Sequence, residues 1–216
     1  MNKNATQGFE IGFFKRKNGV TEEKMLLANK AMEELFLLKE EKILKHMTLK
    51  IGENLYADIA IAQSKLDAQM TCAKWTSNRH ALSFLDLIEV VKYEGLDMLT
   101  FAEIINGPIS KESDSKFAHE IVSFRFKDEV SSEDQKLMMG VLNEKLVSYD
   151  GFLSRDYYYS VDNGRWIDFV LWSDESLAKK ASESIVNDPQ AGSVLSQIDE
   201  KTMIFSHYAW VGGVKK

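Results

Sequence analysis

The chain of 216 residues has an ordinary globular composition, with 44% hydrophobic and 28% charged residues and a net charge of −6. No cluster of Lys or Arg stands out, which argues against a nucleic-acid surface, and no apolar run approaches the roughly 20 residues of a membrane span. Cys72 is the only cysteine, so an internal disulfide is excluded. A single thiol and an N-terminus without a signal peptide predict a cytoplasmic protein.

The first half predicts a strand, a helix, a hairpin, a helix and a strand, from alternating polarity in the strands and an apolar stripe in the helices. The predicted elements are a strand at 9–15, a helix that begins after Thr21, strands at 43–50 and 55–61, a helix from Ser64 to about 77 that continues to Val90, and a strand at 98–104. The order βαββαβ is that of a ferredoxin-like unit.

A polar stretch at 106–116, which holds one of the two prolines, predicts a linker. The predicted elements after it are a strand at 119–126, a helix at 132–148, strands at 151–160 and 165–172, a helix at 174–186, a helical piece around 191–198 and a strand at 203–211. The second half therefore predicts the same order of elements as the first.

The two halves also match in sequence when the numbering is shifted by 110, without a gap. The shift pairs Glu10 with Glu120, Phe14 with Phe124, Tyr56 with Trp166, Asp58 with Asp168, Ala68 with Ala178, Leu85 with Leu195 and Ile88 with Ile198. A constant register over the whole half predicts a tandem duplication.

The strand at 165–172 follows Asp162-Asn163-Gly164, a strong signal for a hairpin turn. Its alternation gives one apolar face and one face that is aromatic and carries a carboxylate; the second face consists of Trp166, Asp168, Val170 and Trp172. We expect the second face to look toward the sheet of the other half and to line a cavity there.

These observations predict an α+β protein of two tandem ferredoxin-like βαββαβ repeats, at 1–105 and 117–216, joined by the linker at 106–116. Their antiparallel sheets are expected to pack face to face as an intrachain α/β barrel, because each sheet has a second apolar face to cover. A monomer with an internal pseudo-dimer and a homodimer both remain open.

Residues 119–211 resemble the dimeric α/β-barrel superfamily, in the branch of the antibiotic-biosynthesis-monooxygenase domains. The resemblance rests on the segments Glu120-Ile-Val-Ser-Phe-Arg-Phe-Lys127, Gly151-Phe-Leu-Ser-Arg155, Gly164-Arg-Trp-Ile-Asp-Phe-Val-Leu-Trp172, Ile198-Asp199 and Met203-Ile-Phe-Ser-His-Tyr208. It implies a barrel fold and, in some members, the cofactor-independent formation of quinones in a cavity that holds a Trp and assorted polar residues.

The haem-degrading members of this superfamily line their pocket with a Trp, an Asn and a haem-ligating His. Trp172 matches the Trp, but Val122 stands where the Asn is expected, and the helix after Trp172 holds no His. The haem pattern is therefore not carried over, and we expect neither a cofactor nor a metal site, since the chain has one Cys and four scattered His.

Asp168 and His207 are the candidate catalytic residues. A carboxylate among aromatic side chains can act as a general base, although Asp168 could equally form a structural ion pair with Arg155 or Arg125. His207, in the last strand, is a candidate proton shuttle or an ordinary residue of the barrel rim. Trp166, Trp172 and Tyr158 are candidates for substrate binding, with packing as the alternative role.

Four further acidic positions are given structural interpretations. Glu10 and Glu120 are expected at the barrel rim, and Glu33 on a solvated helix face. Asp58, the counterpart of Asp168, is expected to have a structural role.

Two functions fit this sequence. The first is a cofactor-independent monooxygenase or isomerase that acts on a small aromatic or polyketide-like molecule in the second repeat. The second is a non-catalytic, stress-related or ligand-binding scaffold. An open pocket of a few hundred Å3 that reaches Asp168 and Trp172 would favour the enzymatic function. An interior filled by side chains would favour the non-catalytic scaffold.

Overall fold

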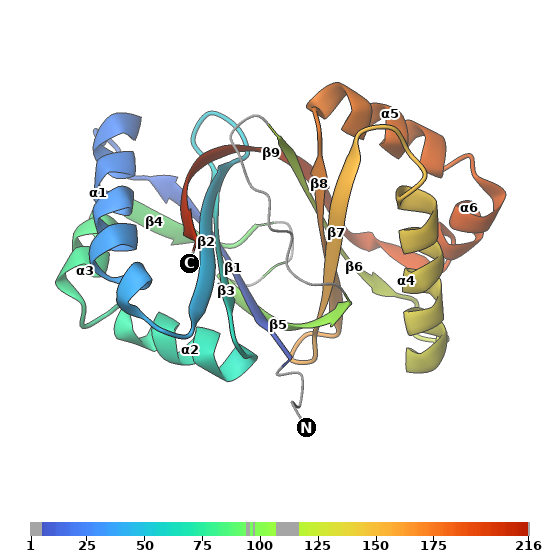
Figure 1. The fold of residues 1–216 in the computed structure, drawn as a ribbon, viewed down its shortest axis with the longest axis horizontal. Coiled ribbons are helices and arrows are strands. Elements are labelled where there is room, and N and C mark those ends of the chain that lie inside the picture. Colours follow the sequence, from blue (N-terminus) through green and yellow to red (C-terminus); the bar gives the residue numbers. More distant parts are fainter. Residues whose placement is uncertain (1–5, 94–95, 97, 107–116, 216) are drawn as a thin grey trace. The chain divides into compact units, whose positions relative to one another are not determined.

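The strands of the chain alternate with helices in the same order twice, as a computed structural model shows (Figure 1). The structure describes residues 6–93, 96, 98–106 and 117–215, so most of the predicted linker at 106–116 lies outside the described residues. The chain divides into two compact units, residues 1–105 with 209–216 and residues 106–208. We call them the first and the second unit.

The first unit consists of β1 (Gly8–Arg16), α1 (Glu22–Leu35), the 3-10 helix η1 (Leu37–Lys39), β2 (Ile43–Lys50), β3 (Tyr56–Ala62), α2 (Lys65–Lys74), α3 (Arg79–Leu85), β4 (Ile88–Val91) and β5 (Leu99–Asn106). All strand pairs are antiparallel: β3 lies between β2 and β1, and β1 pairs on its other side with β5 and β4. The last residues of β9, 209–215, pair with β2.

The second unit consists of β6 (Ala118–Phe126), α4 (Ser132–Leu146), β7 (Phe152–Ser160), β8 (Arg165–Trp172), α5 (Glu175–Ile185), α6 (Pro189–Leu195) and the part of β9 (Ile198–Lys215) up to residue 208. Here β8 lies between β7 and β6, and β6 pairs with β9, again antiparallel throughout. Gly164 closes the β7–β8 hairpin with a φ of 64°, a conformation that glycine adopts without strain.

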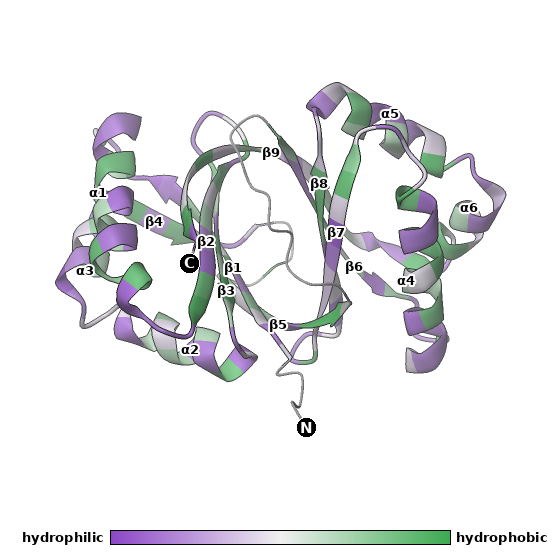
Figure 2. Ribbon diagram, in the orientation of Figure 1, coloured by the Kyte–Doolittle hydropathy of each residue, from purple (hydrophilic) through white to green (hydrophobic). Residues whose placement is uncertain are grey.

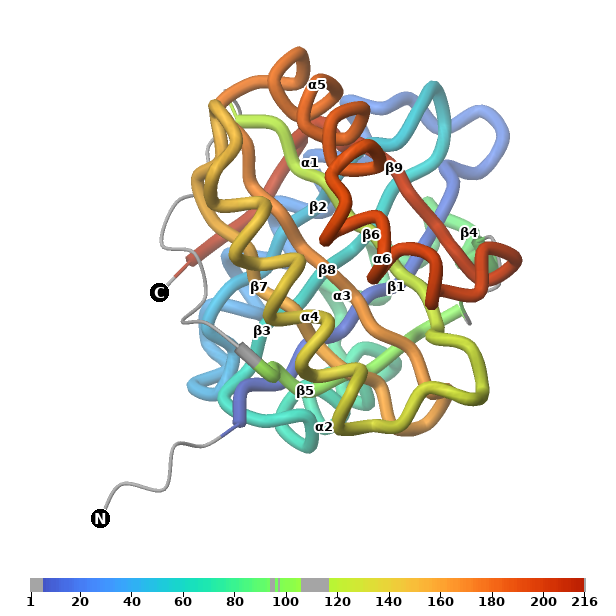
Figure 3. The backbone as a smooth tube through the Cα atoms, turned by 90° about the vertical axis from the view of Figure 1, so that its right-hand side faces the viewer, coloured from blue at the N-terminus to red at the C-terminus, as the bar shows by residue number. Residues whose placement is uncertain are grey.

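Helices cover one face of the sheet in each unit. Figure 2 shows hydrophilic and hydrophobic residues alternating along α1 and α4, as expected of helices that pack one face against a sheet. In the second unit α4 lies across β7 and β8 (Figure 3), and Leu142 of α4 joins Trp166 of β8 in one buried cluster. In the first unit Met25 and Met32 of α1 pack with Tyr56 of β3 in the same way.

The predicted helix from Ser64 to about 77 and its continuation to Val90 form two separate helices, and the continuation ends at Leu85. Asn78 begins a new helix, because its side chain accepts hydrogen bonds from the backbone N–H groups of His80 and Ala81. Residues 88–91 then form β4, which pairs with β1.

The two units use the same strand register. In the first, Gly12 of β1 lies opposite Asp58 of β3; in the second, Val122 of β6 lies opposite Asp168 of β8. Both pairs are related by the shift of 110 seen in the sequence. The common register brings equivalent side chains to equivalent places in each unit. None of the helices in the described part of the chain has the length and apolarity that crossing a membrane would require.

Candidate functional site

The second unit holds a pocket of about 680 Å3 between its sheet and its helices. The sheet contributes Glu120, Val122, Phe124, Asp168, Trp172, Ile198, Glu200, Met203 and Phe205, and the helices and the turns after them contribute Leu142, Leu146, Ser182, Ile185, Val186, Gly192, Leu195 and Ser196. The lining is mostly apolar, with a few polar groups, which is the usual make-up of a small-molecule site. Asp168 and Trp172, two of the five predicted site residues, lie in its wall.

Asp168 is buried and uses only one of its carboxylate oxygens. Nη2 and Nε of Arg155 donate to Oδ2 at 2.7 and 3.2 Å, and Nη1 of Arg155 donates to the backbone oxygen of Met139. Oδ1 of Asp168 has no hydrogen-bond partner among the described residues. Burial raises the pKa of Asp168, and the adjacent guanidinium of Arg155 lowers it again in part. The carboxylate is therefore anchored on one side and open on the other.

Trp172 is fully buried at the end of β8, next to the same pocket. Its ring packs edge-on against Phe152, with the centroids 5.8 Å apart. The indole Nε1, which can only donate, has no acceptor among the described residues. A buried donor and a buried acceptor, Nε1 of Trp172 and Oδ1 of Asp168, are thus both unsatisfied beside one cavity.

A second polar pair borders this pocket. Glu120, in the wall, is only 4% exposed. Its Oε2 lies 3.1 Å from Nε2 of His207, so His207 reaches the pocket through Glu120 and does not line it. Glu120 was expected at the barrel rim; it is buried, because it lies near the start of β6 on the face that the helices cover.

Trp166 and Tyr158 lie outside the pocket. Trp166 is packed in the core, where its Nε1 donates to Oε1 of Gln135 at 2.9 Å. Tyr158 pairs with Ile167 across the β7–β8 ladder, which puts it on the opposite face of the sheet from Asp168. The structure therefore brings together Asp168, Trp172 and, through Glu120, His207.

The face of β8 with Trp166, Asp168, Val170 and Trp172 was expected to look toward the other sheet, and this is wrong. These residues pack against α4, α5 and α6 of their own unit. Alternation along a strand separates two faces but does not tell which of them the helices cover. The cavity predicted beside Asp168 exists, but between sheet and helices.

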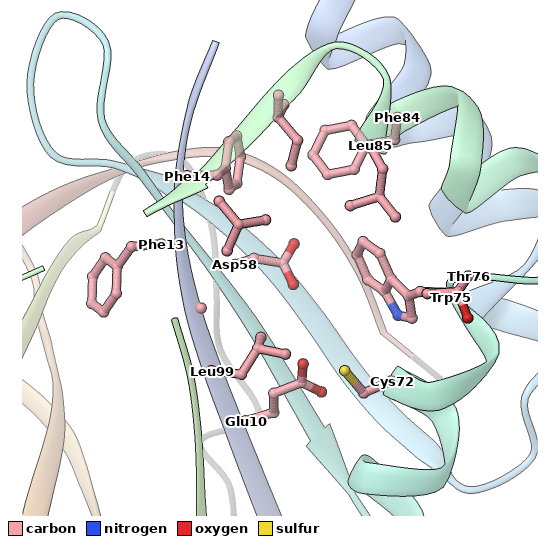
Figure 4. Close-up of a pocket in the computed structure, with 13 residues that line it drawn as sticks. Glu10, Phe13, Phe14, Asp58, Cys72, Trp75, Thr76, Phe84, Leu85 and Leu99 are labelled. Atoms are coloured by element: carbon pink, nitrogen blue, oxygen red, sulfur yellow. The ribbon is translucent and has the colours of Figure 1, made fainter. Parts of the chain in front are cut away.

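The first unit has a smaller pocket, of about 210 Å3, at the equivalent place (Figure 4). Ten of its lining residues match residues of the larger pocket by the shift of 110: Glu10 with Glu120, Gly12 with Val122, Phe14 with Phe124, Asp58 with Asp168, Cys72 with Ser182, Trp75 with Ile185, Thr76 with Val186, Leu85 with Leu195, Ile88 with Ile198 and Val90 with Glu200. Each unit therefore carries the same two carboxyl groups in its pocket.

A chain of hydrogen bonds runs from the first pocket into the core, and the sequence analysis missed it. Nε2 of His46 lies 2.8 Å from Oδ1 of Asp58, and Nδ1 of His46 lies 2.9 Å from Oε1 of Glu33. Nδ2 of Asn29 donates to the same oxygen of Glu33 and to Oγ1 of Thr48. The expectation that Glu33 is solvated is wrong, since it is 3% exposed. The available signal was His46 itself, a titratable side chain in the interior of a predicted strand.

The imidazole of His46 is held as a cation. Burial alone would lower its pKa, but the attraction of Asp58 and Glu33 and their hydrogen bonds outweigh burial and raise the pKa to about 10. The ladder places His46 opposite Ala60 and Arg155 opposite Val170, so a cation stands at the same place in both units. Each pocket thus has an Asp paired with a buried cation.

Glu10 and Cys72 form the other side of the first pocket. Burial and the nearby Asp58 raise the pKa of Glu10 to about 8, against a hydrogen bond from the Cys72 thiol and the attraction of His46. Burial and the carboxyl of Glu10 raise the pKa of Cys72. At neutral pH the pocket therefore presents a protonated carboxyl and a protonated thiol. Within the described residues, no group of three or more His, Cys, Asp or Glu could hold a metal ion.

The comparisons with known proteins identify the fold. No family model matches the sequence, and no curated protein matches it. Among solved structures, a candidate monooxygenase from Fusobacterium nucleatum superposes with a TM-score of 0.68 at 13% identity, covering 98% of this chain and 95% of that chain. An anthrone oxidase-like protein gives a TM-score of 0.61 at 12% identity, covering 99% and 94%.

A chlorite dismutase from Candidatus Nitrospira defluvii, solved in complex with imidazole, gives a TM-score of 0.65 at 10% identity, covering 96% of this chain and 92% of that chain. These proteins belong to the dimeric α/β-barrel superfamily. The chain shares their α+β fold over nearly its whole length. At these identities the likeness concerns the fold alone.

Proposed function

We propose that the pocket of the second unit binds a small aromatic, polyketide-like molecule and oxygenates it without a cofactor. One observation carries the proposal: Oδ1 of Asp168 and Nε1 of Trp172 are buried beside a cavity of about 680 Å3 and find no hydrogen-bond partner in the part of the chain that the structure describes. Unsatisfied buried polar groups are costly and rare, and a ligand with one hydroxyl or acidic C–H group and one carbonyl would satisfy both.

The size of the pocket favours several fused rings. A cavity of about 150 Å3 holds a single benzene, so this pocket has room for a tricyclic molecule. The mostly apolar lining from α4, α5 and α6 suits such rings, and the carboxyl groups all lie on the sheet side.

The chemistry follows from a carboxylate with a raised pKa. Asp168 takes a proton from an activated carbon of the substrate, for which burial makes it a stronger base than a solvated carboxylate. The resulting carbanion, stabilised by its rings, passes electrons to dioxygen. For anthrone the balance is anthrone plus O2 to anthraquinone plus water, in which one oxygen atom enters the ring and the other leaves as water. Glu120 and His207 can exchange the protons of the departing oxygen.

The test is the oxidation of anthrone in aerobic buffer, followed by oxygen uptake and by the absorbance of anthraquinone. Asp168→Asn should lower kcat by about 10²-fold to 10⁴-fold, as expected for the loss of a general base. Trp172→Phe keeps a ring and removes the donor, and should mainly raise KM. Asp128→Asn, the same change on an exposed turn, is the matched control. Equal turnover by wild type and Asp168→Asn would refute the proposal.

One observation favours the non-catalytic alternative, a ligand-binding scaffold. Arg155 stabilises the ionised form of Asp168, which weakens the carboxylate as a base. In that case aromatic ligands would bind, Asp168→Asn and Trp172→Phe would weaken their binding, and no oxygen would be consumed.

We also infer that the two units arose by tandem duplication, with repeats at 1–105 and 117–216 and the two sheets face to face in one chain. The support is the common shift of 110 in strand register and in pocket lining. Small-angle scattering should fit such a barrel, and sedimentation velocity would separate a monomer from a homodimer. A scattering curve of two separated units would contradict the barrel.

A further inference from the structure

We propose that the pocket of the first unit is a second active site, an isomerase centre in which Asp58 is the base and Glu10 the acid for a neutral, single-ring unsaturated ketone. It is separate from the oxygenation proposed for the second unit and does not depend on it. The argument rests on the placement of the two carboxyl groups, on their unlike partners and on the size of the cavity.

The strand register places the two carboxyl groups on either side of one gap. Gly12 lies opposite Asp58, so Glu10, two residues earlier, is its diagonal neighbour on the same face. Diagonal neighbours on antiparallel strands lie roughly 7–8 Å apart. Gly12 has no side chain, and that of Leu99 lies against it, so Leu99 borders the space between the two carboxyl groups. Figure 4 shows Glu10 and Asp58 both directed into the cavity, with Cys72 and Trp75 on its far side.

The partners of the two groups make them chemically unlike. Asp58 accepts from the imidazolium of His46 through Oδ1, which leaves Oδ2 for a substrate. Glu10 is 4% exposed, and the Cys72 thiol, a weak donor, is its one hydrogen-bond partner among the described residues. A pKa of about 8 keeps Glu10 protonated at neutral pH. Two carboxyl groups with such unlike surroundings, one beside a cation and one without a charged partner, are typical of an acid–base pair.

The cavity selects the class of substrate. Its volume of about 210 Å3 is moderately larger than the roughly 150 Å3 that holds benzene, so one substituted ring fits and a tricyclic molecule does not. The remaining lining is largely apolar, with Phe14, Trp75 and Phe84 around the cavity. An anionic substrate would be repelled by ionised Asp58, which leaves neutral ketones.

The reaction balances without any other reactant. Asp58 takes a proton from the carbon between the carbonyl and the C=C bond, and the carbonyl oxygen takes the proton of Glu10, which gives a dienol. Asp58 then returns its proton to the far end of the former C=C bond, and the dienol O–H proton returns to Glu10. The net change moves the double bond into conjugation, with no oxidation or reduction.

His46 and Glu33 act through Asp58 and are positioning residues. Glu33 fixes the imidazole through Nδ1, and Asn29 fixes Glu33. The ionisable groups that face Asp58 and its partner are Glu10, His46, Glu33 and Cys72.

The test uses the full chain and cyclohex-3-en-1-one, whose conversion to cyclohex-2-en-1-one is followed by ultraviolet absorbance. The wild type should accelerate it over buffer. Asp58→Asn should lower kcat at least about 100-fold, and Glu10→Gln, which preserves shape and neutral charge at pH 7, about 10-fold to 100-fold. Glu34→Gln, the same change on an exposed side chain, should leave the rate unchanged.

A second readout separates chemistry from folding. His46→Gln removes the cation that positions Asp58, so kcat should fall while KM changes little, a split that a purely structural role would not produce. Circular dichroism checks that each variant is folded. A wild-type rate no greater than that of buffer, or wild-type rates in folded Asp58→Asn and Glu10→Gln, would overturn the proposal. Because anthrone is assayed separately, failure of this site is distinguishable from failure of the other.

Discussion

Nη2 of Arg155 lies 2.7 Å from Oδ2 of Asp168, and the pair is buried in the second unit. A buried ion pair contributes little net stability compared with apolar residues, because desolvation offsets the attraction. Loss of one partner alone destabilises the folded state much more, since it leaves a buried charge uncompensated. Substitutions of Arg155 and Asp168 should therefore be far from additive in their effect on the free energy of unfolding.

The first prediction is a double-mutant cycle on this pair. Arg155→Met should lower the free energy of unfolding by about 3–5 kcal/mol, because it strands the Asp168 carboxylate. Combining it with Asp168→Leu should recover most of the loss. Urea denaturation of the two single variants and the double variant measures the coupling. Additive losses would mean that solvent reaches Asp168 and that the pair is not buried in solution.

The second prediction compares two tryptophans of the same strand. Trp166 is packed on all sides by Phe126, Tyr157 and Tyr159, so Trp166→Ala should cost about 3–5 kcal/mol. Trp172 borders the pocket of about 680 Å3, so Trp172→Ala should cost only about 1–2 kcal/mol, because the space beside the ring is already open. Denaturation curves of both variants measure the two losses in the free energy of unfolding. Equal losses would argue that the pocket is closed in solution.

The strands, the hairpin at Gly164 and the repeated order of elements follow from local patterns, and the sequence predicts them well. Asp168 and Trp172 were predicted because a carboxylate between large aromatic residues stands out within one strand. The direction of that face was not predictable, since it depends on which side α4 packs. The network of Glu33 and His46 was missed because its members lie in α1 and β2 and meet only in the folded chain.

The third prediction concerns stability at alkaline pH. The folded state raises the pKa of Glu10 from 4.5 to about 8 and that of His46 from 6.5 to about 10. Both groups therefore hold protons in the folded state that the unfolded chain has lost. Their contribution to stability is complete below the unfolded pKa values and is lost as the pH rises through the folded ones.

Between pH 6.5 and 8 the stability contributions of Glu10 and His46 are lost together. Each lowers the free energy of unfolding by up to about 1.4 kcal/mol per pH unit. The urea midpoint should fall steadily from pH 6 to pH 10. Glu10→Gln removes one titrating group, so its midpoint should fall less steeply below pH 8 and keep the slope above it. A midpoint that is flat from pH 6 to pH 10 would show that neither group is buried as described.

The last prediction uses Cys72 as a reporter of the first pocket. As the only cysteine of the chain, it gives an unambiguous mass shift with iodoacetamide. Burial and the neighbouring Glu10 raise the pKa of the thiol, and the thiolate is the reactive species. Cys72 is partly exposed, yet it should react much more slowly at pH 8 than a cysteine in an unstructured peptide.

In Glu10→Gln the repulsion between the Glu10 carboxylate and the Cys72 thiolate is gone. Labelling should therefore accelerate about 10-fold or more at pH 9, where Glu10 is ionised in the wild type, and little at pH 6, where it is neutral. Glu34→Gln should label like the wild type at both pH values. Equal acceleration at pH 6 and pH 9 would mean that the substitution opens the pocket instead of removing a charge. The charge of Glu10 would then not control the reactivity of the Cys72 thiol.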